Sequence, residues 1–269
     1  MYKAVFIDVD GTLITSDHRI SLATFDTIQK LKEQNILVVL VSARPLSGII
    51  PLVEELGLLS NPVASLNGAY IASTGEIIFD SMIDHGTIAR LHASLQKYTT
   101  TNIYYQHNKW FSESRDHHTD HEQKITSVPI ILQPFSHTLQ SWQTHHTGPN
   151  KLLVIGADAI ETKKIENDLK AQFGDHLNIY TSKPIYLEVM NKKASKTNAV
   201  KFIIERYHIA QEETIAIGDN FNDKEMIQFA GKGVAMGNAP DEIKAVANYI
   251  TDTNNNDGVS KALNKIFDL

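Results

Sequence analysis

Short apolar runs alternate with amphipathic stretches along the first 80 residues of the chain. The run 4–7 stops at an acidic cluster and Gly11, which predicts a buried strand that ends in a tight turn. Ser21 precedes a stripe of apolar residues at helical spacing, and the run 36–41 after it predicts a second buried strand. The stripe consists of Leu22, Phe25, Ile28 and Leu31. Together these segments predict one β-α-β unit.

The next segments continue the alternation. We expect a helix over 46–56 that ends at Gly57, a strand over 63–66 and a hairpin turn at 73–76. Strands that alternate with helices favour a parallel sheet with right-handed crossovers.

The same alternation returns near the end of the chain. Helices are expected over 196–206 and 224–229, and strands over 214–217 and 234–236, as the other half of the same sheet. A loop at 254–258 precedes a last short helix.

The middle of the chain, 83–189, differs in character. Aromatic stretches at 103–105 and 110–111 suggest antiparallel strands, and helices are expected near 88–98 and 160–173. The sequence therefore predicts an α/β fold with a core domain formed by residues 1–82 and 190–269, and an inserted α+β domain formed by residues 83–189.

Composition narrows the function. The 269 residues are 42% apolar and carry a formal charge of −6, so the chain has the apolar content of a globular protein. The negative charge gives no general attraction to nucleic acid or an anionic membrane, and we expect neither as a partner. The absence of cysteine excludes disulfides and thiolate chemistry and suits the cytoplasm. A monomer is the default expectation, and an oligomer stays open.

Acidic clusters follow two of the predicted strands. Asp8 and Asp10 come directly after the first strand, and Asp219 and Asp223 follow the strand over 214–217. Side chains two apart on a strand point the same way, so Asp8 and Asp10 should face one crevice at the carboxyl edge of the sheet. Because neighbouring carboxylates repel each other, a divalent cation would relieve the repulsion. The clusters predict a magnesium site.

Four motifs in this order resemble those of the haloacid dehalogenase (HAD) superfamily. Asp8-Val9-Asp10-Gly11-Thr12-Leu13 resembles its first signature, and Val41-Ser42-Ala43-Arg44-Pro45 its second. Lys196 in Ala194-Ser195-Lys196-Thr197 resembles the third, and Gly218-Asp219-Asn220-Phe221-Asn222-Asp223 the fourth. The place of the insert and Asn67-Gly68-Ala69 are similar to Cof-type, class IIB members. That implies a Rossmann-like HAD core with a C2B-type cap. Ala43 and Thr197 stand where glycine is common, which puts the fit around a phosphate in question.

The resemblance implies a magnesium-dependent phosphatase that acts on a small-molecule phosphate ester. Asp8 would be the nucleophile that attacks phosphorus, and Asp10 would protonate the leaving alkoxide and then activate water. Magnesium would be held by Asp8, the main-chain carbonyl of Asp10, and Asp219. The substrate would be a sugar phosphate, a phosphorylated cofactor or another small ester, with the cap closing over its leaving group.

The remaining motif residues would bind the phosphate. Ser42 would donate a hydrogen bond to a phosphoryl oxygen, Lys196 would offset negative charge, and Asn222 would add a donor. Asp223 would hold Lys196 or a water on the metal.

Two other functions remain open on the same fold. A sugar phosphomutase would keep the nucleophile but return the phosphoryl group to a sugar before water attacks. A non-catalytic sensor of phosphorylated metabolites would bind without turnover, although it would have no need to retain both Asp8 and Asp10.

Three further patterns are weaker. His117 and His121 have the i, i+4 spacing of a transition-metal site, but an exposed polar surface explains them more simply. The stretch 231–237 is rich in glycine without the spacing of a nucleotide-binding loop, which favours a loop, a strand and a turn. The aromatic residues at 104–105 and 110–111 are expected to pack within the cap.

Overall fold

The computed structural model describes residues 1–126 and 128–269, which group into two compact units. The first unit comprises Met1–Ala43, Ile49–Ile78 and Ser195–Leu269, and the second comprises Arg44–Gly48 and Phe79–Ala194. Within the described residues we find no helix long and apolar enough to span a membrane.

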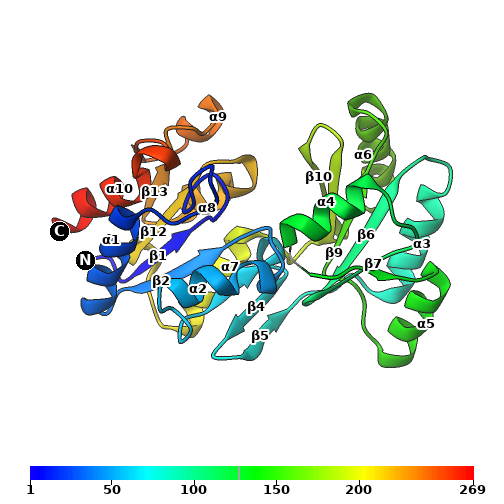
Figure 1. Cartoon of the computed structure of the whole chain (residues 1–269), viewed down its shortest axis with the longest axis horizontal. Helices are drawn as coiled ribbons and strands as arrows, with labels where there is room; N and C mark the ends of the chain where they lie inside the picture. Colours follow the sequence, from blue (N-terminus) through cyan, green and yellow to red (C-terminus); the bar gives the residue numbers. More distant parts are fainter. Residues whose placement is uncertain (127) are drawn as a thin grey trace. The chain divides into compact units, whose positions relative to one another are not determined.

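An eight-stranded sheet, in the order β14-β13-β12-β1-β2-β3-β4-β5, forms the centre of the first unit (Figure 1). Neighbouring strands from β14 to β3 are parallel, whereas β3 and β4 are antiparallel. The strands are β1 (Ala4–Ile7), β2 (Leu37–Val41), β3 (Val63–Ser65), β4 (Tyr70–Ser73), β5 (Glu76–Asp80), β12 (Thr214–Gly218), β13 (Lys232–Ala235) and β14 (Tyr249–Ile250). The predicted α/β fold is confirmed, and the sheet also contains the predicted second half from the end of the chain.

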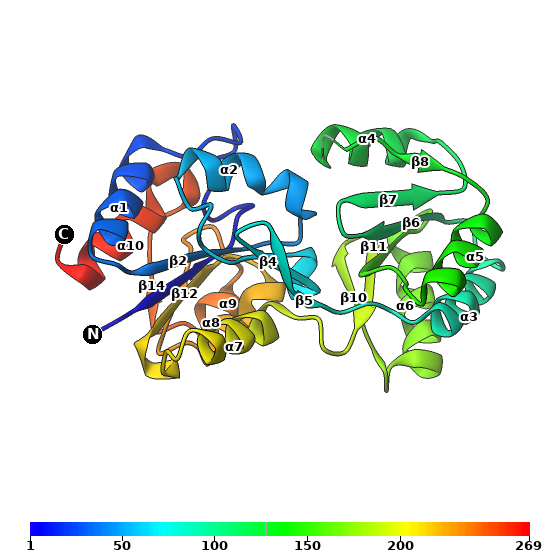
Figure 2. The ribbon, with the colours of Figure 1, turned by 90° about the horizontal axis from the view of Figure 1, so that it is seen from below.

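Helices lie on both sides of this sheet, with α1 and α2 above it and α7 and α8 below it in Figure 2. Their bounds are α1 (Leu22–Glu33), α2 (Ile50–Glu55), α7 (Lys196–Arg206), α8 (Lys224–Phe229), α9 (Asp241–Lys244) and α10 (Gly258–Phe267). Short 3₁₀ turns are η1 (Leu46–Gly48), η2 (Leu66–Gly68), η3 (Gln211–Glu213), η4 (Phe221–Asp223) and η5 (Asn254–Asn256). Ser21 caps α1 as predicted, because its side chain accepts a hydrogen bond from the amide of Thr24.

Two predicted elements differ in detail. The expected helix over 46–56 is divided into η1 and α2, and α2 begins with proline in its first turn, where the missing N–H costs no hydrogen bond. The expected strand over 63–66 ends at Ser65, because Leu66, Asn67 and Gly68 all have positive φ angles. The hairpin turn at 73–76 is present, with positive φ at Thr74 and Gly75.

The second unit contains a six-stranded sheet in the order β10-β11-β9-β6-β7-β8. All its strand pairs are antiparallel except β7 with β8. Its elements are β6 (Thr101–Gln106), β7 (Lys109–Ser112), β8 (Ile131–Leu132), β9 (Lys151–Ile155), β10 (Leu177–Lys183), β11 (Tyr186–Asn191), α3 (His85–Leu95), α4 (His117–Thr126), α5 (Phe135–His145) and α6 (Ala159–Phe173). Helices α3, α5 and α6 bury their apolar stripes against this sheet. The unit is therefore the inserted α+β domain that the sequence predicts, and the bounds 83–189 stay a prediction.

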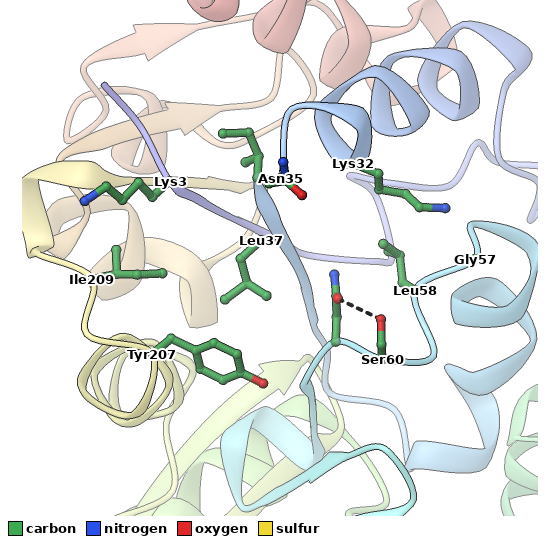
Figure 3. A pocket seen from close by; sticks show the side chains of 11 residues that line it. Lys3, Lys32, Asn35, Leu37, Gly57, Leu58, Ser60, Tyr207 and Ile209 are labelled. Carbon is green, nitrogen blue, oxygen red and sulfur yellow. Dashed lines mark hydrogen bonds between the residues drawn. The ribbon is translucent and has the colours of Figure 1, made fainter.

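A cavity of about 520 Å³ opens in the first unit at the amino ends of its parallel strands (Figure 3). Lys3, Lys32, Leu37 and Tyr207 are among the residues that line it. Both ammonium groups have protein acceptors, since Lys3 pairs with Glu213 at 2.7 Å and Lys32 donates to the carbonyl of Leu56 at 2.9 Å. None of the predicted site residues lines this cavity.

Candidate active site

Asp8 lies at the carboxyl end of the central strand β1. All four residues of β1 are buried between β2 and β12, and the amide of Asp8 still donates to the carbonyl of Ile217 at 3.0 Å. The chain then turns, with the amide of Leu13 donating to the carbonyl of Asp8. As a result Asp8 is buried and Asp10 is exposed.

The two carboxylates differ in exposure, because the strand ends at Ile7 and Asp10 lies in the turn after it. That both face one crevice stays a prediction. The predicted metal contact of Asp10 uses its main-chain carbonyl and is not affected by this difference.

Asp219 and Asp223 follow β12, which is the neighbour of β1. Asp223 is fully buried, and one of its oxygens accepts hydrogen bonds from the amides of Asp219 and Asn220, both at 3.0 Å. Asp219 accepts a hydrogen bond at 2.9 Å from the hydroxyl of Thr12, in the turn after β1. These bonds hold the loop after β12 against the turn after β1.

Gly11 makes this approach possible. It has φ = +84°, and a Cβ atom there would lie 2.4 Å from Oδ2 of Asp219. Only glycine combines this backbone conformation with the absence of a side chain. The first motif therefore requires glycine at position 11, because Asp219 lies in close contact with the turn.

Lys196 crosses from α7 to the acidic cluster. Ser195 caps the helix by accepting a hydrogen bond from the amide of Asn198, which places Lys196 in the first turn. The Lys196 side chain is 1% exposed, and its Nζ contacts a carboxylate oxygen of Asp8 and lies 2.5 Å from one of Asp223. The one ammonium thus bridges two buried carboxylates.

The electrostatics of the cluster reflect an excess of negative charge. Burial raises the pKa of Asp8 well above its usual range, and the charges of Asp223 and Asp219 act in the same direction against the opposing effect of Lys196. Burial and the charge of Asp223 raise the pKa of Asp219 to about 6. Burial alone would lower the pKa of Lys196, but Asp223 and Asp8 outweigh it and keep that pKa above its ordinary value.

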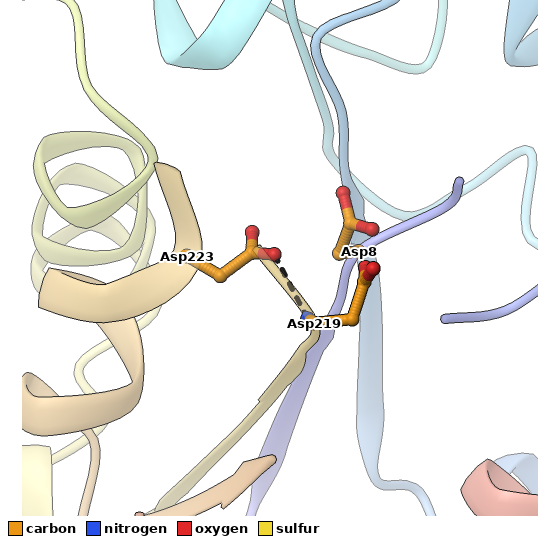
Figure 4. A group of neighbouring side chains, drawn as sticks. All are labelled: Asp8, Asp219 and Asp223. Carbon is orange, nitrogen blue, oxygen red and sulfur yellow. Dashed lines mark hydrogen bonds between the residues drawn. The ribbon is translucent and has the colours of Figure 1, made fainter. Parts of the chain in front are cut away.

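This donor set fits a divalent cation. Oxygens of Asp8, Asp219 and Asp223 lie within 4.8 Å of one another, and Figure 4 shows Asp8 and Asp219 side by side. Three carboxylates against one ammonium leave two negative charges when all are ionised. Carboxylate oxygens are the ligands that Mg²⁺ prefers. Asp223 is engaged by Lys196 and two amides, so Asp8 and Asp219 are the side chains best placed to hold the ion.

Ser42 and Asn222 lie in loops at the same edge of the sheet. Ser42 follows β2 and is fully buried, with its amide bonded to the carbonyl of Ala64 and its carbonyl to the amide of Asn67, both at 2.8 Å. Asn222 donates from Nδ2 to Oδ1 of Asn67 at 3.1 Å. Asn67, Thr12 and Asn238 also contact residues of the site, although their sequence pattern did not point to it. The side-chain Nδ2 of Asn238 donates to the carbonyl of Gly11 at 2.9 Å.

The weaker sequence patterns give no second site. Among the described residues, the three aspartates are the one group of three or more histidine and carboxylate side chains close enough together to share an ion, and His117 and His121 on α4 are not part of it. The glycine-rich stretch 231–237 contains β13 with a turn after it. Tyr104, Tyr105 and Trp110 are buried, as expected of residues that pack within the second unit.

The sequence model of the haloacid dehalogenase-like hydrolases matches residues 5–263. The chain belongs to this family. A Haemophilus influenzae protein named "Putative phosphatase" is 37% identical, with 99% of both chains covered. The 5-amino-6-(5-phospho-D-ribitylamino)uracil phosphatase YcsE of Bacillus subtilis is 30% identical over 97% of this chain and 94% of its own.

A solved haloacid dehalogenase-like hydrolase from Bacteroides thetaiotaomicron matches with a TM-score of 0.87 and 32% identity, covering 99% of this chain and 100% of that one. The resemblance of the four motifs to the HAD superfamily is confirmed, and so is the predicted enzyme class. The chain is a phosphatase of the haloacid dehalogenase-like family, and its substrates are phosphate esters.

Proposed function

We propose that this HAD phosphatase hydrolyses small phosphorylated metabolites through a covalent phosphoryl group on Asp8. The observation that carries the proposal is the position of the Asp8 carboxylate, at the end of the central strand, in contact with Lys196 and beside Asp219. A carboxylate becomes an effective nucleophile toward a phosphate dianion only where positive charge offsets the repulsion between the two anions.

Each residue then has a separate task. An oxygen of Asp8 bonds to phosphorus as the ester P–O bond breaks, and Asp10 gives its proton to the departing alkoxide. Water next attacks phosphorus, Asp10 takes the proton of that water, and the bond from Asp8 to phosphorus breaks to release inorganic phosphate. The exposure of Asp10 supports this role, because a group that transfers a proton twice per turnover has to contact both the leaving group and the attacking water.

The charge on the phosphoryl group is offset by groups around Asp8. Lys196 and the hydroxyl of Ser42 would contact phosphoryl oxygens, and Asn222 would add an N–H donor. Asp8, Asp219 and the main-chain carbonyl of Asp10 would hold Mg²⁺, which when bound supplies positive charge to the phosphoryl oxygens. Asp223 keeps Lys196 in place through its contact at 2.5 Å.

The proposed substrate class is small phosphorylated metabolites, including sugar phosphates and phosphorylated cofactor precursors. The support comes from YcsE, the relative at 30% identity, whose substrate is a phosphorylated ribityl compound. A substrate screen would identify which members of this class the enzyme hydrolyses.

The test is the hydrolysis of p-nitrophenyl phosphate, and of a panel of sugar phosphates, with and without Mg²⁺. We expect Asp8→Asn to abolish phosphate release, and acid-quenched wild-type enzyme to carry a hydroxylamine-sensitive phosphoryl group that Asp8→Asn lacks. Asp26→Asn, an exposed aspartate on α1, is the matched control and should retain activity. Equal activity of Asp8→Asn and wild type would refute the mechanism, and transfer to a second sugar without phosphate release would favour a phosphomutase.

A further inference from the structure

The turn η2, formed by Leu66, Asn67 and Gly68, contacts three separate loops of the site. We infer that Asn67 is a positioning residue of the phosphatase, which fixes the phosphate-binding Ser42 and Asn222 relative to each other. This inference rests on the proposed function, because it assigns no contact of Asn67 with the substrate itself.

The first contact is with the loop after β2. The amide of Asn67 donates to the carbonyl of Ser42 at 2.8 Å, and the amide of Ser42 donates to the carbonyl of Ala64 at 2.8 Å. Both main-chain polar groups of Ser42 are therefore held by β3 and η2. A main chain fixed on both sides in this way holds the Cβ atom of Ser42 at a defined place, from which the hydroxyl would donate a hydrogen bond to a phosphoryl oxygen.

The second contact is with the loop after β12. Oδ1 of Asn67 accepts a hydrogen bond at 3.1 Å from Nδ2 of Asn222, a residue 155 positions away in the chain. This bond fixes the orientation of the Asn222 side-chain amide, so that its N–H donors and its carbonyl oxygen each point in a defined direction. Without it, the amide of Asn222 could rotate and present its carbonyl oxygen to the phosphate, where the partial negative charge of that oxygen would be repelled by the phosphate anion.

The third contact is with the start of α7, which carries Lys196. A Cβ atom at Gly68 would lie 2.4 Å from the carbonyl oxygen of Ser195 and 2.9 Å from Cβ of Ala199. The turn therefore packs directly on the cap residue of that helix. Ser42, Asn222 and the base of Lys196 come from three distant segments, and η2 contacts all of them.

The backbone of η2 explains why asparagine occupies this position. Leu66, Asn67 and Gly68 have φ angles of 49°, 54° and 81°, and Asn67 has ψ = 36°, the left-handed region. Asparagine adopts this conformation more readily than other residues with a side chain, and it offers an amide oxygen that glycine lacks. Such backbone conformations persist where the surrounding structure holds them, and they concentrate at functional sites.

Asn67→Gly separates the two roles of the residue. Glycine keeps the left-handed backbone and the N–H to Ser42, and removes the side-chain bond to Asn222. We expect kcat/KM for p-nitrophenyl phosphate to fall about 10-fold, and vanadate inhibition to weaken, because a donor to the phosphoryl group loses its orientation. The unfolding temperature should stay within about 3 °C of wild type.

A double-mutant cycle with Asn222→Ala distinguishes positioning from a general structural effect. If Asn67 acts through Asn222, then Asn67→Gly causes no further loss in the Asn222→Ala background. Losses that multiply in the double variant would overturn the inference, and so would wild-type kcat/KM in Asn67→Gly.

Asn35 provides a matched control at the other end of β2. It also has a left-handed backbone, with φ = 59°, and its side chain lies at the cavity far along the strand from the site. Asn35→Gly should leave kcat/KM unchanged. Failure of the inference and of the proposed function are distinguishable. Wild-type activity of Asp8→Asn refutes the proposed mechanism, whereas an inactive Asp8→Asn with a fully active Asn67→Gly refutes only the role of Asn67.

Discussion

Replacing Lys196 by methionine should destabilise the protein in a way that a divalent cation reverses. The Lys196 ammonium is 1% exposed, and it contacts the carboxylates of Asp8 and Asp223, whose side chains are 7% and 0% exposed. Methionine has a similar length and fills the same space, so the change removes charge with little loss of packing. Asp8, Asp219 and Asp223 would then face one another without a cation from the protein.

The expected loss in the free energy of unfolding depends on the number of ion pairs that the substitution breaks. Removing one partner of a buried ion pair costs about 3–5 kcal/mol, and Lys196 is shared by two such pairs, so the upper part of this range is expected in EDTA. A cation that binds only the folded state adds about 2.7 kcal/mol at 100 times its Kd. Saturating Mg²⁺ should therefore recover much of the loss.

Urea unfolding at pH 7.5, with EDTA or with Mg²⁺, measures both effects. The double variant Lys196→Met/Asp223→Asn tests the cause, because neutralising a carboxylate removes part of the unbalanced charge and should restore stability without restoring activity. A Lys196→Met protein as stable as wild type in EDTA would refute the reasoning, and so would a double variant less stable than the single one.

Three other predictions concern single positions. Gly11→Ala should lower activity by at least about 10-fold, because its Cβ would lie 2.4 Å from Asp219 at φ = +84°; steady-state kinetics would measure this, and wild-type kcat would contradict it. Burial lowers the pKa of His92, although the charge of Glu113 acts in the opposite direction. Below pH 6.5 the His92 side chain therefore binds a proton more readily in the unfolded chain than in the folded protein. Stability should fall as the pH drops from 7.5 to 5.5, less steeply in His92→Gln, and equal slopes would exclude this cause. Glu166 is 4% exposed at its side chain; burial opposes ionisation, but bonds from Lys163, Lys170 and Thr181 lower its pKa. Its stabilising contribution should be present above pH 4.5 and lost below it, and urea unfolding of Glu166→Gln should show a loss at pH 7 that shrinks toward pH 4.

The sequence predicts the site residues that lie at the carboxyl ends of strands. Asp8 follows one apolar run and Asp219 another, and parallel neighbouring strands bring their carboxyl ends together. Lys196 was recognisable through the resemblance of its motif to the third HAD signature, and the helix expected from position 196 is confirmed, with Ser195 as its cap.

Asn67 was not predictable in the same way. Its function depends on a left-handed backbone and on partners 25 and 155 positions away, Ser42 and Asn222. Local residue types do not predict the partners, whereas the Asn-Gly pair one residue after the strand does indicate positive φ angles.

In the second unit, the spacing of apolar residues does not predict every helix. Helix α4 (His117–Thr126) is built almost entirely of polar residues, so its sequence contains no apolar stripe that would predict a helix. The helix over 88–98 was expected too late in the chain because Asp84 caps α3, which begins at His85. By contrast α6, with apolar residues at helical spacing and Asp158 as its cap, was predicted at its observed place.

The position of β1 between β2 and β12 has a consequence for biosynthesis. During translation β2 follows β1 closely, but β12 begins at Thr214, and the contact of Thr12 with Asp219 spans 207 positions. At 5–20 residues per second the ribosome needs roughly 10–40 s to make that stretch. For this time one edge of β1, all four residues of which are apolar and buried in the folded protein, has no partner to pair with, and such edges promote aggregation. The nascent chain should therefore be most prone to aggregation before β12 emerges, and Asp8 meets Asp219 and Asp223 only after most of the protein has been synthesised.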